Sequence, residues 1–499
     1  MSTALPRSPI ITLLLAGTAG ALFPLATAPW DFWPLALISI ALLLTVLRQA
    51  SPRRAFWLGW LYGSGLFGVG ASWVYVSIHD YGYAPVALAA LLTGVFCIGL
   101  GLFFALLCWT WSRWLRAAPG SDTLGFAALW TLFEWLRVWV LTGFPWLFAG
   151  YSQIDAPLRG WAPLTGVIGL SFLVVLSASL LLKLNRHPQR WATVGGLLIL
   201  IWGGGGLLER VEWAYPRGDR LQVAMVQANI AQERKWNPDY LQQTLIQYAE
   251  MSAPLWGTDL IVWPEAALPA YRDRIDVFLN SAEQIAQENG SSLITGVPTR
   301  VAAPERPSGS AARNSLLLLG EASAEYHKRH LVPFGEYVPL ESILRGLIRF
   351  FDLPMSSFVP GPDTAVLFPV GQHQLAPSIC YEIVYPDLIA ETSADANALI
   401  TVSNDTWFGR SAGPLQHLQM ARMRALENAR PLIRSTNNGV SALIDHRGKI
   451  LTQGEQFTRE VVRGSIQPMM GTTAFAQTGS VPVLLISALI VLLTARRSR

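Results

Sequence analysis

Long apolar runs separated by short polar connections make up the first 208 residues of the chain. About 20 consecutive apolar residues cross the hydrocarbon core of a bilayer, and these runs are long enough to do so. One more apolar run lies close to the end of the sequence. The pattern therefore predicts about eight transmembrane helices, at 8–28, 32–48, 56–78, 84–112, 122–142, 163–183, 191–208 and 479–495.

From Leu221 onward, short apolar runs alternate with amphipathic segments. We expect strands at 222–230, 260–265, 292–299, 314–319, 374–382, 398–405 and 431–445, the last as a hairpin, and helices at 239–251, 274–287 and 414–429. This alternation is typical of a layered α/β domain. The sequence thus predicts a helical membrane bundle over 1–210, an α/β domain over 219–467, and a linker with a final transmembrane helix over 468–499.

The composition agrees with a membrane protein that carries one polar domain. Hydrophobic residues make up 52% of the chain and charged residues only 14%, against about 25% charged residues in ordinary soluble proteins. The 20 tryptophans suit an extensive membrane interface. The formal net charge is +4, but no dense run of Lys and Arg occurs, so nucleic acid is not expected as a partner.

Basic residues gather on alternate connections between the predicted spans. Because such residues stay on the cytoplasmic side, both termini are predicted to be cytoplasmic and the α/β domain to lie outside. Arg159, on an outer connection, is the exception. The residues that set this orientation are Arg7, Arg48, Arg53, Arg54, Arg113, Arg116, Lys183, Arg186, Arg190, Arg496, Arg497 and Arg499.

Two further features of the pattern have more than one interpretation. Glu134 and Arg137 lie three residues apart on one face of a predicted span, where they form either a structural pair or part of a functional site. The segment 339–352 has an apolar face and a flank with Arg345 and Arg349. It is predicted to be an amphipathic helix in the membrane surface, or else a helix packed on its own domain.

Only three cysteines occur, and they fall in different surroundings. Cys97 and Cys108 lie in an apolar run and are expected to pack within the bundle, whereas Cys380 ends an apolar strand in the polar half of the chain. The spacing indicates neither a disulfide framework nor a metal site, and no cofactor is expected. A lone cysteine is more often a packing residue than a nucleophile, so a role for Cys380 depends on nearby partners.

Partners of the required kind occur upstream. Glu265 follows a proline at a strand end, Lys328 follows a strand through a short polar link, and Glu336 lies in an apolar loop where an acid is costly unless it is paired. Acyl transfer through a thiol needs a base for the thiol proton and a donor for the oxyanion. Taken alone, Glu265 and Lys328 are more simply interpreted as exposed charges, whereas Glu336 in its apolar loop suggests a site.

The order of these motifs resembles the Glu–Lys–Cys pattern of the nitrilase superfamily. Its parts here are Trp263-Pro264-Glu265, Lys328 ahead of 332–336, and Cys380-Tyr381-Glu382. Together with the membrane bundle, the whole chain resembles the bacterial apolipoprotein N-acyltransferases. The resemblance implies a nitrilase-like α-β-β-α sandwich outside the membrane, a multi-pass location in the bacterial inner membrane with a periplasmic catalytic domain, and most simply a monomer.

The resemblance also implies roles for individual residues. Cys380 would be the nucleophile, Glu265 the general base and Lys328 the oxyanion donor together with the backbone N–H of Tyr381. Glu336 would orient Lys328 or the incoming amine. Trp236, Tyr381 and Glu382 would line the substrate cleft, although Trp236 is also compatible with an exposed aromatic residue and the other two with strand-end packing and pairing.

The reaction that the resemblance implies is a two-step acyl transfer through a cysteine thioester. The donor would be the sn-1 ester of a phospholipid, and the acceptor the α-amine of a diacylglyceryl-modified N-terminal cysteine on an apolipoprotein. A competing hypothesis within the same class is a membrane-anchored amidohydrolase of the nitrilase type, in which water accepts the acyl group. A transporter with an outer ligand-binding domain is a second competing hypothesis, although paired inverted halves, which are common in transporters, are not seen. A catalytically inactive scaffold is a third.

Overall fold

The computed structural model describes residues 8–186, 189, 191–304, 309–337 and 358–497. Eight long helices of this part form a bundle, and the predicted spans fall on them. Proline occupies the first turn of several of these helices, where its missing N–H costs nothing. The helices are α1 (Pro9–Leu22), α2 (Pro34–Leu47), α3 (Pro52–Gly70), α5 (Val86–Thr110), α6 (Phe126–Trp139), α7 (Ala162–Arg186), α8 (Trp191–Leu208) and α16 (Val481–Arg496).

Within the described residues, four helical segments are long and apolar enough to cross a membrane: Val86–Leu115, Ser121–Thr142, Pro157–Leu184 and Trp191–Leu208. A fifth is formed if Pro52–Gly70 and Val74–Tyr81, which are bent by 61° at their junction, count as one span. Three shorter apolar helices, Ile10–Ala26, Pro34–Leu47 and Val481–Arg496, fall below that length. The bundle of apolar helices is thus confirmed, and the number of eight spans stays a prediction.

Small residues let α3 and α5 pack with their backbones in close approach. A Cβ atom on Gly63 would lie 2.7 Å from the Cα atom of Gly101, and one on Gly59 would lie 2.3 Å from the carbonyl oxygen of Phe104. Lipid offers little hydrophobic drive for helices to associate, so close packing of this kind is what holds such helices together.

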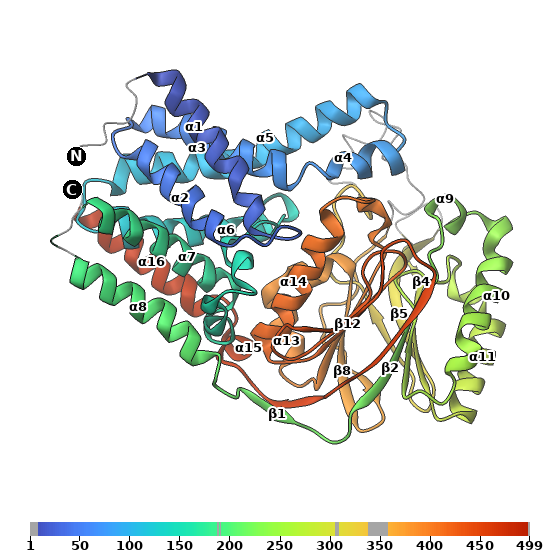
Figure 1. Cartoon of the computed structure of the whole chain (residues 1–499). Helices are drawn as coiled ribbons and strands as arrows, with labels where there is room; N and C mark the ends of the chain where they lie inside the picture. Colours follow the sequence, from blue (N-terminus) through green and yellow to red (C-terminus); the bar gives the residue numbers. More distant parts are fainter. Residues whose placement is uncertain (1–7, 187–188, 190, 305–308, 338–357, 498–499) are drawn as a thin grey trace.

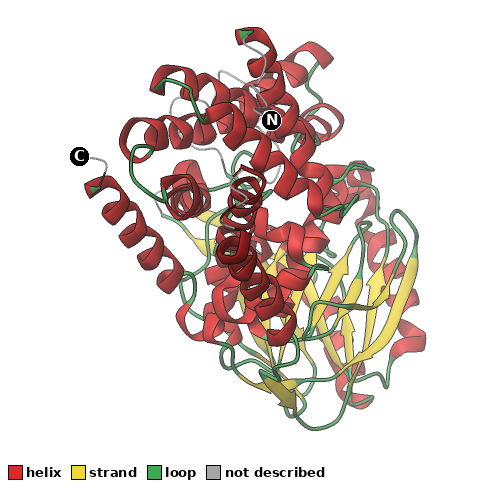
Figure 2. Ribbon diagram, turned by 60° about the vertical axis from the view of Figure 1, so that its left-hand side comes forward, coloured by secondary structure: helices red, strands yellow, loops and turns green. Residues whose placement is uncertain are grey.

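The α/β domain consists of two six-stranded sheets packed face to face, with a pair of helices on each outer face (Figures 1 and 2). One sheet has the order β13-β2-β3-β4-β5-β6 and the other β12-β11-β10-β9-β8-β7. Helices α10 (Leu241–Ser252) and α11 (Asp276–Glu288) cover the first sheet, while α13 (Pro386–Ser393) and α14 (Gly413–Asn428) cover the second and face the bundle (Figure 1). The predicted α-β-β-α sandwich is therefore present.

The strands of the first sheet are β2 (Leu221–Gln227), β3 (Leu260–Val262), β4 (Ser292–Ala302), β5 (Ser310–Leu319), β6 (Ala324–His327) and β13 (Glu460–Ile466). Those of the second are β7 (Phe368–Val370), β8 (His373–Ile379), β9 (Ala398–Ser403), β10 (Leu432–Thr436), β11 (Ala442–Ile444) and β12 (Ile450–Gln453). The hydrophobic pattern did not predict β6, β7, β12 and β13, which are short or carry polar residues on both faces. Nor did it predict the pairing of β1 (Ala214–Pro216) with β14 (Met469–Gly471), which joins the two connections to the bundle.

Strand direction brings the candidate residues to one edge. Strands β3 and β4 are parallel, and β6 runs the same way as β4 because two antiparallel steps separate them. The chain therefore leaves β3 toward Glu265 and β6 toward Lys328 at the same edge of the first sheet. In the second sheet, β8 and β9 are parallel and end together, at Cys380 and Asn404.

Bundle and α/β domain share one continuous apolar core. Buried residues of α13 and α14 pack in the same cluster as residues of α3, α6 and α7. The domain is therefore seated on the bundle through packed apolar residues as well as through its two chain connections. The predicted amphipathic segment 339–352 lies outside the described residues.

Candidate active site

Cys380 occupies a sharp turn directly after β8. Its φ angle is +53°, in the left-handed region that costs a residue with a side chain about 1–2 kcal/mol. The one-turn helix Cys380–Val384 starts there, and the thiol is half-buried at its beginning. This strained turn places the sulfur at the strand end, as the sequence pattern predicted, and beside Ser403, whose hydroxyl lies 3.3 Å from Sγ.

Lys328 lies between two carboxylates, and all three side chains are buried. Its Nζ atom is 2.9 Å from Oε1 of Glu336 and 3.4 Å from Oε1 of Glu265. Burial disfavours the ammonium, but the charges of Glu336 and Glu265 outweigh burial and raise the pKa of Lys328 well above its ordinary value. Lys328 is therefore a fixed positive charge.

Glu265 is held in place by its backbone and by both of its oxygens. The chain turns directly after β3, and a Cβ atom on Gly296 would lie 2.4 Å from the backbone nitrogen of Ala266, so this turn needs a glycine on β4. Oε2 accepts a hydrogen bond of 2.8 Å from the backbone N–H of Asn404. The carboxylate thereby joins the edges of the two sheets.

Two charged side chains from the opposite sheet, Glu265 and Lys328, act on the Cys380 thiol. Burial raises the pKa of Cys380 well above its usual range, the Glu265 carboxylate raises it further, and the Lys328 ammonium lowers it. The balance keeps the thiol protonated at rest. For this thiol to act as a nucleophile a base has to remove its proton, and Glu265 is the carboxylate whose charge acts most strongly on it.

Asn314 joins the two carboxylates, and the sequence motifs did not single it out. Its Nδ2 group donates to Oε1 of Glu265 at 2.8 Å and to Oε1 of Glu336 at 3.0 Å. One amide group thus uses both hydrogens to fix two acids on either side of Lys328. A polar residue inside the apolar strand β5 was the available signal.

Lys235 is a second buried ammonium group that the sequence motifs did not indicate. It ends the short helix α9 (Gln232–Lys235), is 2% exposed, and donates from Nζ to the backbone carbonyl of Glu265 at 3.0 Å. Burial lowers the pKa of Lys235 to about 8, while the charges of Glu265 and Cys380 act in the opposite direction. A lysine beside an exposed run of charges gave no sign of this position.

The remaining predicted residues occupy different places. Trp236 follows α9 and is half-buried. The Tyr381 hydroxyl donates to the carbonyl of Gly143 on the bundle at 3.0 Å.

Glu382 is fully buried behind the turn. It accepts hydrogen bonds from the backbone N–H groups of Ile379, Arg329 and His330 and from the Tyr326 hydroxyl. In this position it fixes the turn of Cys380 to the segment that carries Lys328.

Fold and site define a class: a thiol-containing carbon–nitrogen hydrolase domain seated on a bundle of apolar helices. A family model described as carbon–nitrogen hydrolase matches residues 222–475, and one described as the apolipoprotein N-acyltransferase N-terminal domain matches residues 19–180. The apolipoprotein N-acyltransferase of Pseudomonas aeruginosa is 51% identical over 93% of this chain and 91% of that protein. The enzyme of the same name from Pseudomonas syringae pv. tomato is 49% identical over 97% of each chain.

The chain therefore belongs to the apolipoprotein N-acyltransferase family, as its sequence motifs predicted. Among solved structures, that of Saccharomyces cerevisiae Nit3, a member of branch 10 of the nitrilase superfamily, aligns with 52% of this chain and 93% of that chain. Its sequence identity is 18% and the TM-score is 0.38.

Proposed function

We propose that this protein transfers an acyl chain from the sn-1 position of a phospholipid to the N-terminal α-amine of a diacylglyceryl-cysteine on apolipoproteins. The observation that carries this proposal is the buried Glu265–Lys328–Glu336 cluster beside the thiol of Cys380, in a domain seated on apolar helices. A site at a membrane face lets a lipid acyl chain reach the sulfur without crossing water. The cluster itself supplies a base, a cation and a nucleophile.

In the first half-reaction, Glu265 takes the proton of the Cys380 thiol and the sulfur attacks the ester carbonyl. The negative charge that develops on the carbonyl oxygen is stabilised by the Lys328 ammonium and by the backbone N–H of Tyr381. When the tetrahedral intermediate collapses, the bond to the glycerol oxygen breaks and Glu265 returns the proton to that oxygen. The products are a thioester on Cys380 and a lysophospholipid.

In the second half-reaction, the α-amine of the modified N-terminal cysteine attacks the thioester carbonyl. Glu265 accepts a proton from the amine, the carbon–sulfur bond breaks, and the proton returns to the sulfur. A new amide is formed and the thiol is regenerated. The thioester keeps most of the acyl-transfer potential of the ester, so the reaction proceeds without a nucleotide, and Glu336 keeps Lys328 charged throughout.

Substrates approach past residues near the turn of Cys380. We assign contact with substrate to Trp236 and Tyr381, and a supporting role to Glu382, because its oxygens already accept four different donors. For the whole chain we propose a bundle over 1–210, a periplasmic catalytic domain over 219–467 and a linker with the last helix over 468–499. Both termini are cytoplasmic in a monomer of the bacterial inner membrane that spans it eight times.

Mass spectrometry of the Cys380 peptide tests this reaction. Purified protein mixed with phospholipid alone is expected to carry an acyl adduct on Cys380 and to release an equal amount of lysophospholipid, whereas Cys380→Ala does neither. A diacylglyceryl-cysteine peptide added afterwards is expected to remove the adduct and become N-acylated. Release of free fatty acid without an N-acylated product indicates an amidohydrolase instead. Consumption of phospholipid without any adduct contradicts the thioester.

A further inference from the structure

His417, on α14, contacts the peptide group that follows the nucleophile. Its Nε2 atom lies 3.1 Å from the backbone carbonyl oxygen of Cys380, and the imidazole is 1% exposed. A carbonyl oxygen only accepts hydrogen bonds, so Nε2 carries the hydrogen. The other ring nitrogen, Nδ1, lies 3.1 Å from Nη2 of Arg434, which only donates. Nδ1 also lies 3.2 Å from Oδ1 of Asp405, which only accepts. The hydrogen that His417 donates to the Cys380 carbonyl is therefore the one on Nε2.

This hydrogen bond determines the direction of the next backbone N–H. The peptide unit is planar and trans, so its C=O and N–H point in opposite directions. An imidazole that holds the Cys380 carbonyl therefore also aims the N–H of Tyr381, and a hydrogen bond accepted by the carbonyl strengthens the N–H as a donor. The strained φ of Cys380 makes such a restraint necessary, because the turn has no intrinsic preference for this conformation.

We propose that His417 is the positioning residue of the oxyanion-binding N–H of Tyr381, and that the membrane bundle holds His417 in place through Trp146 and Gln416. The inference rests on the proposed function, which gives the Tyr381 N–H its role. It extends that function by making the acyl-transfer geometry depend on side chains of the bundle.

Residues of the bundle hydrogen-bond to α14 next to His417. The indole N–H groups of Trp146 and Trp73 both donate to Oε1 of Gln416, at 2.7 and 3.1 Å, and Nε2 of Gln416 donates to the carbonyl of Gly70 at 3.2 Å. The ring of Trp146 also lies against the imidazole of His417, with 5.9 Å between the ring centroids. Gln416 and its three partners thus fix the rotation of α14 at the residue that precedes His417.

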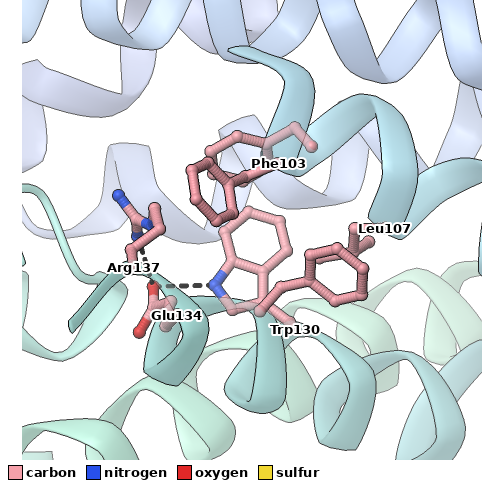
Figure 3. A pocket seen from close by; sticks show the side chains of 7 residues that line it. Phe103, Leu107, Trp130, Glu134 and Arg137 are labelled. Atoms are coloured by element: carbon pink, nitrogen blue, oxygen red, sulfur yellow. Dashed lines mark hydrogen bonds and ion pairs between the residues drawn. The ribbon is translucent and has the colours of Figure 1, made fainter. Parts of the chain in front are cut away.

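The buried pair of Glu134 and Arg137 fixes Trp146 in turn. Nη1 of Arg137 donates to the backbone carbonyl of Trp146 at 2.9 Å, and Oε1 of Glu134 accepts from the backbone N–H of Ala149 at 2.9 Å. Figure 3 shows the pair beside Trp130, whose indole N–H also donates to Glu134 at 2.8 Å. Two charges inside the bundle therefore hold both ends of the connection 146–149. This gives the pair, whose role the sequence left open, a part in positioning the site.

On the other side of the imidazole, Asp405 and Arg434 complete the restraint. Nη2 of Arg434 donates to Oδ2 of Asp405 at 2.6 Å, and Nδ1 of His417 lies 3.2 Å from Oδ1 of the same carboxylate. All three side chains are buried. The ring is thus held at both nitrogens, and one of them faces the nucleophile's own peptide.

A pair of variants with different reach tests the role of His417. The amide nitrogen of His417→Gln reaches the position of Nε2, whereas that of His417→Asn reaches only the position of Nδ1. We expect His417→Asn to slow acyl-enzyme formation from phospholipid by about tenfold to a hundredfold. This is less than the roughly hundredfold to thousandfold effect of losing an oxyanion donor outright, because the N–H of Tyr381 is still present. His417→Gln should recover most of that loss. Alkylation of Cys380 by iodoacetamide needs no oxyanion donor, so its rate and pH profile should be unchanged in both variants.

Two results would overturn this role for His417. One is that alkylation and acylation fall together in His417→Asn, since the residue then only maintains the fold around the thiol. The other is that His417→Gln and His417→Asn acylate equally slowly. A wild-type protein that forms no acyl adduct is a different outcome and contradicts the proposed function itself.

The link to the bundle is tested with Trp146→Phe, which removes the indole N–H and keeps an aromatic ring. We expect acylation to slow about fivefold, as for the loss of one hydrogen bond, while Trp139→Phe, at a residue that is 53% exposed on α6, has no effect. Combined with His417→Asn, Trp146→Phe should cost less than the product of the two separate effects, because both act on one restraint. Strictly multiplicative effects, or full activity of Trp146→Phe, would show that the bundle does not hold His417.

Discussion

Lys328 and Glu336 form an ion pair that is buried from solvent, with 2.8 Å between Nζ and Oε2. The second oxygen of Glu336 lies 2.9 Å from the same ammonium. Because Glu265 is farther from Nζ, at 3.4 Å, Glu336 is the closer of the two counter-ions in the described structure. These distances agree with the proposed roles, in which Glu265 exchanges protons while Glu336 keeps the lysine charged and in place.

Glu336→Gln tests this division of roles. The substitution keeps a hydrogen-bond acceptor near Lys328 but removes the charge, so the ammonium becomes costly to bury and its position relative to the thiol loosens. We expect kcat for N-acylation to fall about a hundredfold, measured with a diacylglyceryl-cysteine peptide. Glu325→Gln, in an ion pair at the domain surface, is the matched control and should retain activity. Retention of activity in Glu336→Gln would mean that Glu265 alone keeps Lys328 in place.

The reactivity of Cys380 should depend on pH in a way that reports Lys328. Burial raises the thiol pKa and the lysine charge lowers it, so the rate of alkylation by iodoacetamide should still be rising with pH above the ordinary thiol pKa of about 8.5. Lys328→Met removes the lowering charge, which moves the thiol pKa further up. Alkylation at a given pH should then slow by about tenfold for each unit of that change.

Peptide mapping by mass spectrometry separates the alkylation of Cys380 from that of Cys97 and Cys108. These two cysteines are buried in the bundle. Cys380→Ala provides the background. Equal alkylation profiles in wild type and Lys328→Met would show that the lysine does not act on the thiol, and Lys328 would then have no place beside the developing oxyanion.

Strand ends were the part of the site that the sequence could predict. Apolar runs that stop at Glu265 and Cys380 mark the edge of a sheet, and the sequence placed Lys328 a short polar link after the strand at 314–319. In the structure that link contains β6, which ends at His327 directly before Lys328. The family resemblance then connected these positions, and the structure brings Glu265, Lys328 and Glu336 into direct contact.

Contacts between distant segments could not be predicted. Lys235 reaches a backbone carbonyl 30 positions away, and His417 reaches one 37 positions away. Neither carries a local signal, because a backbone acceptor has no side chain to mark it in the sequence. The pair of Glu134 and Arg137 was visible from its spacing, but its partner Trp146 depends on a turn through Leu141, where φ is +54°.

Lys235→Met should weaken catalysis in a pH-dependent manner. With a pKa lowered to about 8, Lys235 is charged at pH 7, where it adds positive potential near the thiolate, and it is largely neutral at pH 9. We therefore expect acyl-enzyme formation to be about tenfold slower in Lys235→Met than in wild type at pH 7, and the two rates to become equal above pH 8. Single-turnover measurements from pH 6.5 to 9.5 give the ratio of the wild-type rate to the variant rate, with the exposed Lys449→Met as control. A ratio that stays constant with pH would assign Lys235 to packing alone.

The free energy of unfolding of the domain should fall in acid because Asp405 becomes protonated. Burial raises the pKa of this carboxyl, but Arg434 and the hydrogen bond from His417 outweigh it and hold the pKa well below its usual range. A group with a depressed folded-state pKa contributes stability that is present above the unfolded value of about 3.9 and is lost as pH falls below it.

Thermal unfolding in detergent at several pH values measures this contribution. At neutral pH, Asp405→Asn should lose about 3–5 kcal/mol of unfolding free energy, because it leaves Arg434 buried without a counter-charge. The difference in unfolding free energy between Asp405→Asn and wild type should become smaller below pH 4. The exposed Asp395→Asn should follow wild type throughout. A gap that persists unchanged into acid would mean that the loss in Asp405→Asn comes from packing and not from charge.

Labelling of single cysteines tests the proposed orientation of the domain. Two variants, each with one introduced cysteine, are made on a Cys380→Ala background. Gln284→Cys is at an exposed position of α11, and Ala117→Cys lies just after the helical segment that ends at Leu115. The distribution of Lys and Arg predicts that a membrane-impermeant maleimide labels Gln284→Cys in intact spheroplasts and labels Ala117→Cys only after the membrane is permeabilised. Labelling of both proteins in detergent shows that each thiol is reactive. The reverse pattern in spheroplasts would place the catalytic domain in the cytoplasm and contradict acyl transfer on the outer face.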